Sequence, residues 1–302
     1  MMLIAGIDAG GSKTECIIVD TEKDKIITRA QTGAANYQVV GLEAACREIK
    51  LALEQAKKRA GISCLKAVGI GLAGAGRRED LVKIEREMGK IMNSRNFFFS
   101  SDAHIALLGA TGGSTGAVLI AGTGSIAYGL KKNGAKIRSG GWGPIIGDEG
   151  SGFWIGLEAA KKAVRAEEMR AEKTELKNLV LEHFNFSKLE ELIPFIYQQQ
   201  LPRQKIAALA PAVFDLAQNG DEAALEICQE AAAELALLAH SALLKLDYQE
   251  DKIAAAGGLI KSSYFYQLLK EKLRENYELE IYKAKKSAAY GAVFMALREL
   301  EN

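Results

Sequence analysis

The chain has 302 residues, 48% of them hydrophobic and 25% charged, a balance typical of a folded protein long enough to form two domains. The formal net charge of +1 predicts neither a nucleic-acid nor a membrane partner, because both would need a basic surface. The four cysteines are scattered without CxxC spacing and no stretch of about 18 consecutive apolar residues occurs, so we expect a cytoplasmic protein without a zinc site.

The chain opens with two apolar segments, residues 3–7 and 16–19, which are predicted to be buried strands of a hairpin. Its tip is rich in glycine, and we expect the glycines to adopt positive φ and to leave backbone N–H groups free to bind an anion. The residues offering donors there are Gly10, Gly11, Ser12, Lys13 and Thr14. Asp8 precedes the tip, where a carboxylate fits a Mg²⁺ ion beside the anion. The alternative is an ordinary hairpin with a charged tip.

The next segments predict alternating strands and helices, because apolar residues recur either in short runs or at spacings of three and four. Strands are expected at 25–30, 67–72 and 97–99, and helices at 42–59, 80–92 and 103–110. Asp102 ends the last of these strands, where open α/β sheets bind ligands, so it could accept the proton of an attacking hydroxyl. The alternative for Asp102 is a helix N-cap.

At Gly116 the pattern starts again with a strand, the turn Gly122-Thr123-Gly124-Ser125 and a returning strand. Two such tips, if they face each other, would bind a polyphosphate from both sides. Helical segments are expected over 153–183, 188–246, 262–275 and 288–300, with short strands at 253–256 and 281–282. We therefore predict an N-terminal domain of residues 1–114 and a C-terminal domain of residues 115–302 with a helical insertion.

Three further stretches contain glycines at informative places. Gly257 and Gly258 follow a strand and would let a flat ring or sugar approach the backbone, unless they form only a tight turn. The loop 139–151 combines five glycines with Trp142 and Asp148, a composition suited to holding a sugar ring. Residues 69–74 match G-x-G-x-x-G, but they follow an internal strand and 76–80 delay the helix, which disfavours a dinucleotide site.

Taken in chain order, the motifs resemble the N-acetylglucosamine kinase branch of the sugar kinase, heat-shock chaperone and actin superfamily, whose domain family also holds the BadF/BadG/BcrA/BcrD ATPases. The likeness spans nearly the whole chain, and the GTGS turn with GGWG and GDEGS is its most specific part. The motifs are Asp8-Ala-Gly-Gly-Ser-Lys-Thr14, Asn36, Asp102, Ala121-Gly-Thr-Gly-Ser125, Gly140-Gly-Trp-Gly143, Gly147-Asp-Glu-Gly-Ser151 and Ala256-Gly-Gly258.

This resemblance implies an α/β fold with two ribonuclease-H-like (actin-like ATPase) domains around an interdomain cleft. It implies an ATP-dependent kinase acting on the 6-hydroxyl of an amino sugar, most simply N-acetylglucosamine, with ATP and Mg²⁺ as cofactors, a small-molecule sugar as substrate and a homodimer as the assembly.

The resemblance also assigns site residues by position. The ATP-binding set is Gly10, Gly11, Ser12, Lys13, Thr14, Gly122, Thr123, Gly124, Ser125, Gly257 and Gly258. Asp8 would lie at the metal and Asp102 would be the catalytic base. The sugar-binding set is Asn36, Asp102, Thr123, Gly141, Trp142 and Asp148. The chain departs from some relatives at Ala73, where they carry a serine that touches the sugar.

Other functions remain open from the sequence. An ATPase that activates a radical dehydratase or reductase would share the ATP turns, but it would hold an iron–sulfur cluster with cysteines, and none lies between Cys64 and Cys228. A hexokinase of broad sugar specificity fits the same motifs, and the candidate sugars are N-acetylglucosamine, glucosamine, N-acetylmuramate, glucose and N-acetylmannosamine. A non-catalytic sugar sensor is disfavoured because Asp102 and both phosphate turns are present.

Overall fold

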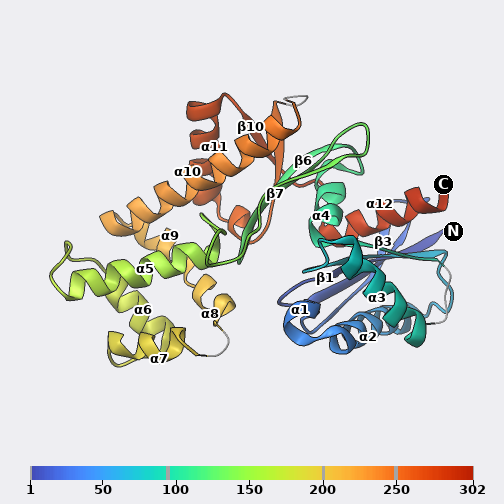
Figure 1. Ribbon diagram of the computed structural model, residues 1–302, viewed down its shortest axis with the longest axis horizontal. Coiled ribbons are helices and arrows are strands. Elements are labelled where there is room, and N and C mark those ends of the chain that lie inside the picture. Colours follow the sequence, from blue (N-terminus) through green and yellow to red (C-terminus); the bar gives the residue numbers. More distant parts are fainter. Residues whose placement is uncertain (1, 93–95, 199–200, 248–250, 302) are drawn as a thin grey trace. The chain divides into compact units, whose positions relative to one another are not determined.

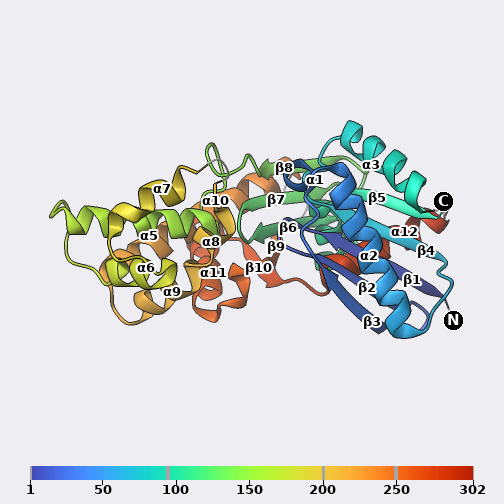
Figure 2. The ribbon, with the colours of Figure 1, turned by 90° about the horizontal axis from the view of Figure 1, so that it is seen from below.

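The computed structural model describes residues 2–92, 96–198, 201–247 and 251–301, which divide into two compact units. Unit 1 comprises Met1–Gly116 and Ala284–Asn302, and unit 2 comprises Ala117–Lys283. Each unit contains one five-stranded mixed sheet covered by helices (Figures 1 and 2). The expected α/β class with two sheet domains is confirmed.

Unit 1 begins with the predicted hairpin. Its elements are β1 (Leu3–Ala9), β2 (Thr14–Asp20), β3 (Lys25–Thr32), α1 (Tyr37–Val40), α2 (Leu42–Ala60), β4 (Ala67–Leu72), α3 (Arg78–Ile91), β5 (Phe97–Ser101), α4 (Asp102–Thr111) and α12 (Ala288–Glu301). The strand order is β3-β2-β1-β4-β5. β1 pairs antiparallel with β2 and parallel with β4, and β5 is parallel to β4. The parallel strands therefore end at one edge of the sheet.

Apolar side chains alternate across this sheet and bury both faces. Helices α2 and α3 pack on the face that carries Ile7 and Ile70, whereas α12 packs on the face that carries Ile4 and Ile17. Because successive side chains of a strand point to opposite faces, odd-numbered residues of β1 face α2 and even-numbered residues face α12.

Unit 2 repeats the same topology. Its elements are β6 (Gly116–Ala121), β7 (Ser125–Leu130), β8 (Lys136–Gly140), α5 (Gly152–Glu167), α6 (Leu176–Phe184), η1 (Leu189–Glu191), α7 (Leu192–Ile196), α8 (Arg203–Ala207), α9 (Ala210–Gln218), α10 (Glu222–Lys245), β9 (Lys252–Ala256), η2 (Leu259–Lys261), α11 (Ser263–Tyr277) and β10 (Glu280–Lys283). The strand order is β10-β9-β6-β7-β8, so β6 takes the place that β1 has in unit 1. The restart predicted at Gly116 is thus a repeat of the sheet.

The longest helix of unit 2 is its structural centre. α10 is long and apolar enough, by length and composition alone, to cross a membrane. Its inward residues, among them Ile227, Leu235 and Leu243, are fully buried in the core that β6, α5 and α11 share. The apolar character of α10 is therefore accounted for by the core of this unit.

The C-terminal helix corrects the predicted domain boundaries. The sequence placed 115–302 in one domain, but 284–302 belong with unit 1. The reason is close packing: a Cβ atom at Gly6 would lie 1.9 Å from the Ala289 carbonyl oxygen, and one at Gly69 would lie 1.9 Å from the Ala292 carbonyl oxygen. These glycines let the backbone of α12 approach the sheet more closely than any side chain allows.

The same packing explains the G-x-G-x-x-G match at 69–74. Gly69 makes room for α12, and a Cβ atom at Gly71 would lie 2.2 Å from Cδ1 of Ile105 on α4. Gly74 lies in the turn after β4 with a φ of +84°. Two of these glycines thus serve helix packing and the third serves a turn, which supports the rejection of a dinucleotide site.

Replacing Gly291 tests the helix packing directly. A Cβ atom there would lie 1.7 Å from the Ile105 carbonyl oxygen, so Gly291→Ala forces α12 away from α4. We expect the free energy of unfolding to fall by about 1–3 kcal/mol, as in other overpacked cores. Chemical denaturation measures it.

The matched control is Gly89→Ala on the exposed side of α3. A Cβ atom at Gly89 meets nothing within 4 Å, so the better helix propensity of alanine should raise stability by about 0.5–1 kcal/mol. Equal effects of the two variants would contradict this account of α12.

Candidate functional site

Two carboxylates meet at the edge where the parallel strands of unit 1 end. Asp8 is in register with Gly71 of β4, and Gly71 is in register with Ser100 of β5. Asp8 shares the α12 face of β1 with Gly6, and α4 begins on that face at Asp102. Because Gly71 has no side chain, nothing from β4 separates the two carboxylates.

The electrostatics of Asp8 follow from this placement. Its pKa is raised from 3.8 to about 7, chiefly by burial and then by the neighbouring charges of Asp102 and Glu15, while Lys13 opposes the rise. Burial also raises the pKa of Asp102, against the stabilising hydrogen bond from the Ala103 N–H. Two partly buried carboxyls with raised pKa values form a site that gains stability from a proton or a cation.

The predicted base Asp102 is not a helix cap. The N-cap of α4 is Ser101, whose side chain accepts a hydrogen bond from the His104 N–H. Asp102 is the first residue of the helix, and its Oδ1 accepts the Ala103 N–H at 2.8 Å. The capping alternative is therefore wrong.

The first glycine turn is built differently from the prediction. Neither Gly10 nor Gly11 adopts positive φ, because the Gly10 N–H closes the turn on the Lys13 carbonyl at 3.0 Å with ordinary backbone angles. Gly11, Ser12 and Lys13 are exposed. Thr14 is fully buried, and its hydroxyl donates to the Gly33 carbonyl at 2.8 Å. The Thr14 side chain thus anchors the turn.

Asn36 lies beside this turn. It caps α1 by accepting the Gln38 N–H at 3.2 Å, and the Gln38 side chain in turn donates to the Gly74 carbonyl at 2.9 Å. A Cβ atom at Gly74 would lie 2.7 Å from the Asn36 side-chain oxygen. Unit 1 thus brings together Asp8, the first turn, Asn36 and Asp102.

In unit 2 the second glycine turn is fastened to the start of α5. The Gly122 N–H donates to the Gly124 carbonyl at 2.9 Å, which closes the turn. The first two N–H groups of α5, from Gly152 and Phe153, donate to the Gly122 and Thr123 carbonyls at 2.8 and 3.2 Å. The turn thus satisfies two of the N-terminal donors of α5, and Ser151 accepts the next one, the Trp154 N–H, at 3.2 Å.

The glycines after β9 lie next to that turn. Gly257 has a φ of +106°, and a Cβ atom there would lie 2.2 Å from the Ala121 carbonyl oxygen. The Gly258 N–H nitrogen lies 3.9 Å from the position of a Cβ at Gly122. The two predicted nucleotide segments of unit 2 are therefore in contact.

Asp148 joins the loop 139–151 to the same turn. It is 4% exposed, accepts the Ser125 N–H at 3.3 Å through Oδ1, and pairs through Oδ2 with Nη2 of Arg203 at 2.6 Å. Burial raises the pKa of Asp148, while Ser125 and Arg203 oppose that rise. Arg203 was not predicted, because nothing in the sequence distinguishes it among 39 lysines and arginines.

The remaining predicted residues of the loop differ in exposure. The Gly141 N–H donates to the Ser125 carbonyl at 3.1 Å, which keeps Gly141 at the turn. Trp142 is 64% exposed, and its ring stacks under the Arg138 guanidinium at 4.7 Å. Ile145 and Ile146 are also exposed. The aromatic and aliphatic residues thus lie on the surface of this unit.

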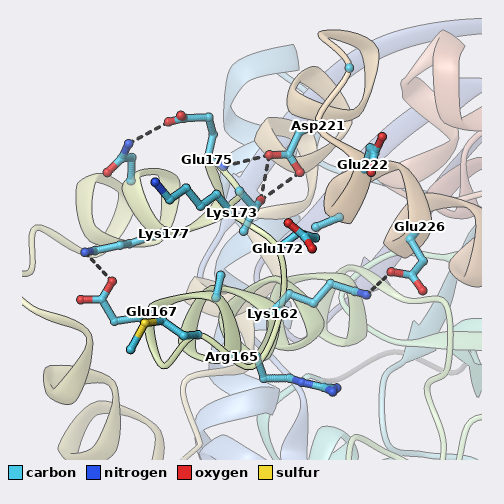
Figure 3. A pocket seen from close by; sticks show the side chains of 17 residues that line it. Lys162, Arg165, Glu167, Glu172, Lys173, Glu175, Lys177, Asp221, Glu222 and Glu226 are labelled. Carbon is cyan, nitrogen blue, oxygen red and sulfur yellow. Dashed lines mark hydrogen bonds and ion pairs between the residues drawn. The ribbon is translucent and has the colours of Figure 1, made fainter.

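A hollow of unit 2 lies at the end of α5 that is far from the glycine turns (Figure 3). Its walls carry internal ion pairs, Lys162 with Glu226 and Lys177 with Glu167, and Asp221 accepts hydrogen bonds from Thr174 and Glu175. The phosphate-turn end of α5 and this end are about 15–20 Å apart along the helix. The hollow is therefore separate from the glycine turns.

The cysteines do not form a cluster. Cys16, Cys46 and Cys228 are buried and Cys64 is exposed, and all four are free thiols. No group of three or more His, Cys, Asp or Glu side chains suited to a metal occurs among the described residues. A metal ion at Asp8 would therefore need ligands from a bound phosphate and water, which is the coordination that Mg²⁺ favours.

The fold and the site define an ATPase of the sugar-kinase and actin type. Residues 5–296 match the BadF/BadG/BcrA/BcrD ATPase family, and the chain belongs to this family. Membership implies ATP binding.

Individual relatives extend this result. The chain is 35% identical to an N-acetylmuramic acid/N-acetylglucosamine kinase of Clostridium acetobutylicum over 307 residues, covering 100% of both. It is 32% identical to an N-acetyl-D-glucosamine kinase of Dictyostelium discoideum over 98% of both. A crystal structure of a candidate N-acetylglucosamine kinase from Chromobacterium violaceum is similar with a TM-score of 0.78 at 25% identity, covering 98% of this chain and 99% of that one. The resemblance stated from the motifs is confirmed.

The raised pKa of Asp8 predicts a pH-dependent stability. Its folded pKa of about 7 exceeds the ordinary 3.8, so this group makes the metal-free protein less stable as the pH rises from about 4 through 7. Asp8→Asn should therefore raise the melting temperature at about pH 8 and leave it nearly unchanged at about pH 4. Calorimetry at both pH values measures it.

Asp24→Asn is a control of opposite sign. Hydrogen bonds from Lys286 and Tyr290 lower the pKa of Asp24, so its contribution is present at neutral pH and is lost as the pH falls through that lowered pKa. This variant should lower the melting temperature at about pH 8. An Asp8→Asn shift of equal size at both pH values would contradict the assigned burial.

Proposed function

We propose that the protein is an ATP-dependent kinase that phosphorylates the 6-hydroxyl of an amino sugar, most simply N-acetylglucosamine. The observation that carries this proposal is Asp102, a partly buried, non-capping carboxylate at the carboxyl edge of the unit 1 sheet with a raised pKa. The kinase names of the curated relatives support the substrate class.

The two units would bind different groups of ATP and the sugar. In unit 1, the turn 10–14 would bind phosphate oxygens through exposed N–H groups, Lys13 and the Ser12 hydroxyl, and Asn36 would bind the sugar. In unit 2, the turn 122–125 would bind phosphate through its backbone, and Gly257 and Gly258 would let the adenosine approach. Thr123, Gly141, Trp142 and Asp148 are the proposed sugar contacts of unit 2. Thr14 would contribute by holding the turn in place, because its hydroxyl already donates a hydrogen bond to the Gly33 carbonyl.

The proton follows a simple route. The 6-hydroxyl of the sugar donates its hydrogen bond to a carboxylate oxygen of Asp102 and transfers its proton there as its oxygen attacks the γ-phosphorus. The bond between the γ-phosphorus and the bridging oxygen breaks, and ADP leaves. The raised pKa of Asp102 makes it a stronger base than an exposed aspartate.

Mg²⁺ fits the carboxylate pair of unit 1. Asp8 and Asp102 oppose each other's ionisation, and a divalent cation held by Asp8 and phosphate oxygens would relieve that repulsion. When bound, the ion would neutralise charge on the phosphates. Asp8 itself would position the ion and keep the edge polar.

An iron–sulfur activator has less support. Such a protein needs several thiolates at one place, and the four free cysteines are divided between the two units, three of them buried.

The motifs fit a hexokinase of broad specificity as well, and a coupled ADP-release assay across the five candidate sugars separates it from an amino-sugar kinase. We also propose a cytoplasmic homodimer, which light scattering tests through the mass in solution.

Asp102→Asn tests the proposed base. The amide keeps the size and the Ala103 contact but cannot accept the proton, so kcat should fall by about 10²–10⁴ while sugar still binds. A coupled assay gives kcat, and calorimetric titration gives sugar affinity.

Asp215→Asn is the matched control, because Asp215 is an exposed carboxylate on α9. It should leave both quantities unchanged. Wild-type turnover in Asp102→Asn would remove Asp102 from the mechanism.

A further inference from the structure

We propose that Arg203 is a positioning residue of the phosphate turn in unit 2: it holds the Asp148 carboxylate in its ionised, oriented form against the Ser125 N–H. This inference deepens the proposed function, and its kinetic readout rests on that function. Its stability readout does not.

The contacts of Asp148 leave little freedom. Its Oδ1 accepts the backbone N–H at the end of the turn, and its Oδ2 binds the guanidinium at 2.6 Å. A Cβ atom at Gly124 would lie 2.9 Å from Oδ2, so the carboxylate also packs against the turn. Any rotation of the Asp148 side chain would therefore disturb Gly124 and Ser125 together.

The backbone at Asp148 is itself constrained. Its φ of +60° is left-handed, a conformation that costs a non-glycine residue energy and persists only where surrounding bonds fix it. Those bonds are present: the Asp148 carbonyl accepts the Ser151 N–H at 3.1 Å, and the next carbonyl, of Glu149, accepts the Ser125 hydroxyl at 2.8 Å. Asp148 is thus the point where the loop and the turn lock together.

Arg203 supplies the positive charge that stabilises the ionised carboxylate of Asp148. Asp148 is 4% exposed, and the adjacent carboxylate of Glu149 opposes its ionisation. Glu234 of α10 lies near Glu149 and adds no positive charge. The guanidinium is the one cation that stabilises ionised Asp148 among the described residues. Its Nε is buried without a hydrogen-bond partner, so Arg203 tolerates an unfavourable environment in order to make this pair.

The pair has a chemical consequence. A carboxylate with one lone pair of each oxygen occupied can still accept a hydrogen bond from a hydroxyl of a bound sugar, and that bond is stronger while the carboxylate is ionised. Without Arg203, burial would leave Asp148 protonated over more of the neutral range, and its bond to the Ser125 N–H would weaken. Arg203 therefore acts on the turn and on the sugar through Asp148.

The test compares Arg203→Met with Arg203→Lys in the full chain. In Arg203→Met, the loss of kcat/KM should be larger at about pH 6 than at about pH 8, by about tenfold for each unit by which the pKa of Asp148 comes to lie above 6. Melting temperature should show the reverse trend, with the larger fall at about pH 8, because there the folded state must hold an unpaired buried charge. Arg203→Lys keeps a positive charge and should therefore show smaller losses of kcat/KM and of melting temperature than Arg203→Met.

Two controls isolate the mechanism. Lys205→Met removes an exposed cation from the same short helix and should change neither profile. In an Asp148→Asn background, Arg203→Met should lose its pH-dependent effect on melting, because an amide needs no counterion.

The outcomes separate the two claims. Equal losses in Arg203→Met at both pH values, or an unchanged pH dependence of melting, would overturn the positioning role. A wild-type protein that phosphorylates none of the five sugars would contradict the proposed function, while the melting comparison would still decide the role of Arg203.

Discussion

Repulsion between two partly buried carboxylates, Asp8 and Asp102, is the constraint on which the candidate site depends. Each loses hydration on folding, and burial, together with the nearby charge of Asp102, raises the pKa of Asp8 to about 7. Such a pair destabilises the chain that carries it unless a cation or a proton joins it. The fold keeps them together because Gly71, which has no side chain, lets Ile105 of α4 pack against β4, and because α12 packs on the same face of the sheet.

The two sheets share a topology but support different chemistry. In unit 1 the strand ends carry acids, and the turn after β1 exposes Ser12 and Lys13. In unit 2 the corresponding turn carries no charged side chain, and its carbonyls are bonded to the N-terminus of α5, which fixes its shape. The ion pair of Asp148 and Arg203 adds a second attachment at the end of that turn. Rigid attachment suits a turn that binds phosphate through its backbone, because the N–H directions are then set before the ligand arrives.

The sequence predicted the elements well where local patterns decide them. β4 over Ala67–Leu72 and α2 ending before Gly61 follow from apolar periodicity and a glycine cap. The repeat at Gly116 followed from a second strand, turn and strand. The predictions that differed depend on tertiary contacts: the place of α12 depends on glycines far away in the sequence, and the φ values of Gly10 and Gly11 depend on how the turn closes. Arg203 is 55 residues from its partner, so no local signal could connect them.

Identifying the phosphorylated atom tests the central claim most directly. The protein would be incubated with ATP, Mg²⁺ and either N-acetylglucosamine or its 6-deoxy analogue, and the products would be followed by ³¹P nuclear magnetic resonance. We expect a phosphomonoester at the 6-position of N-acetylglucosamine and no phosphorylated sugar from the 6-deoxy analogue. A phosphorylated 6-deoxy sugar, or ADP release without any sugar phosphate, would contradict it.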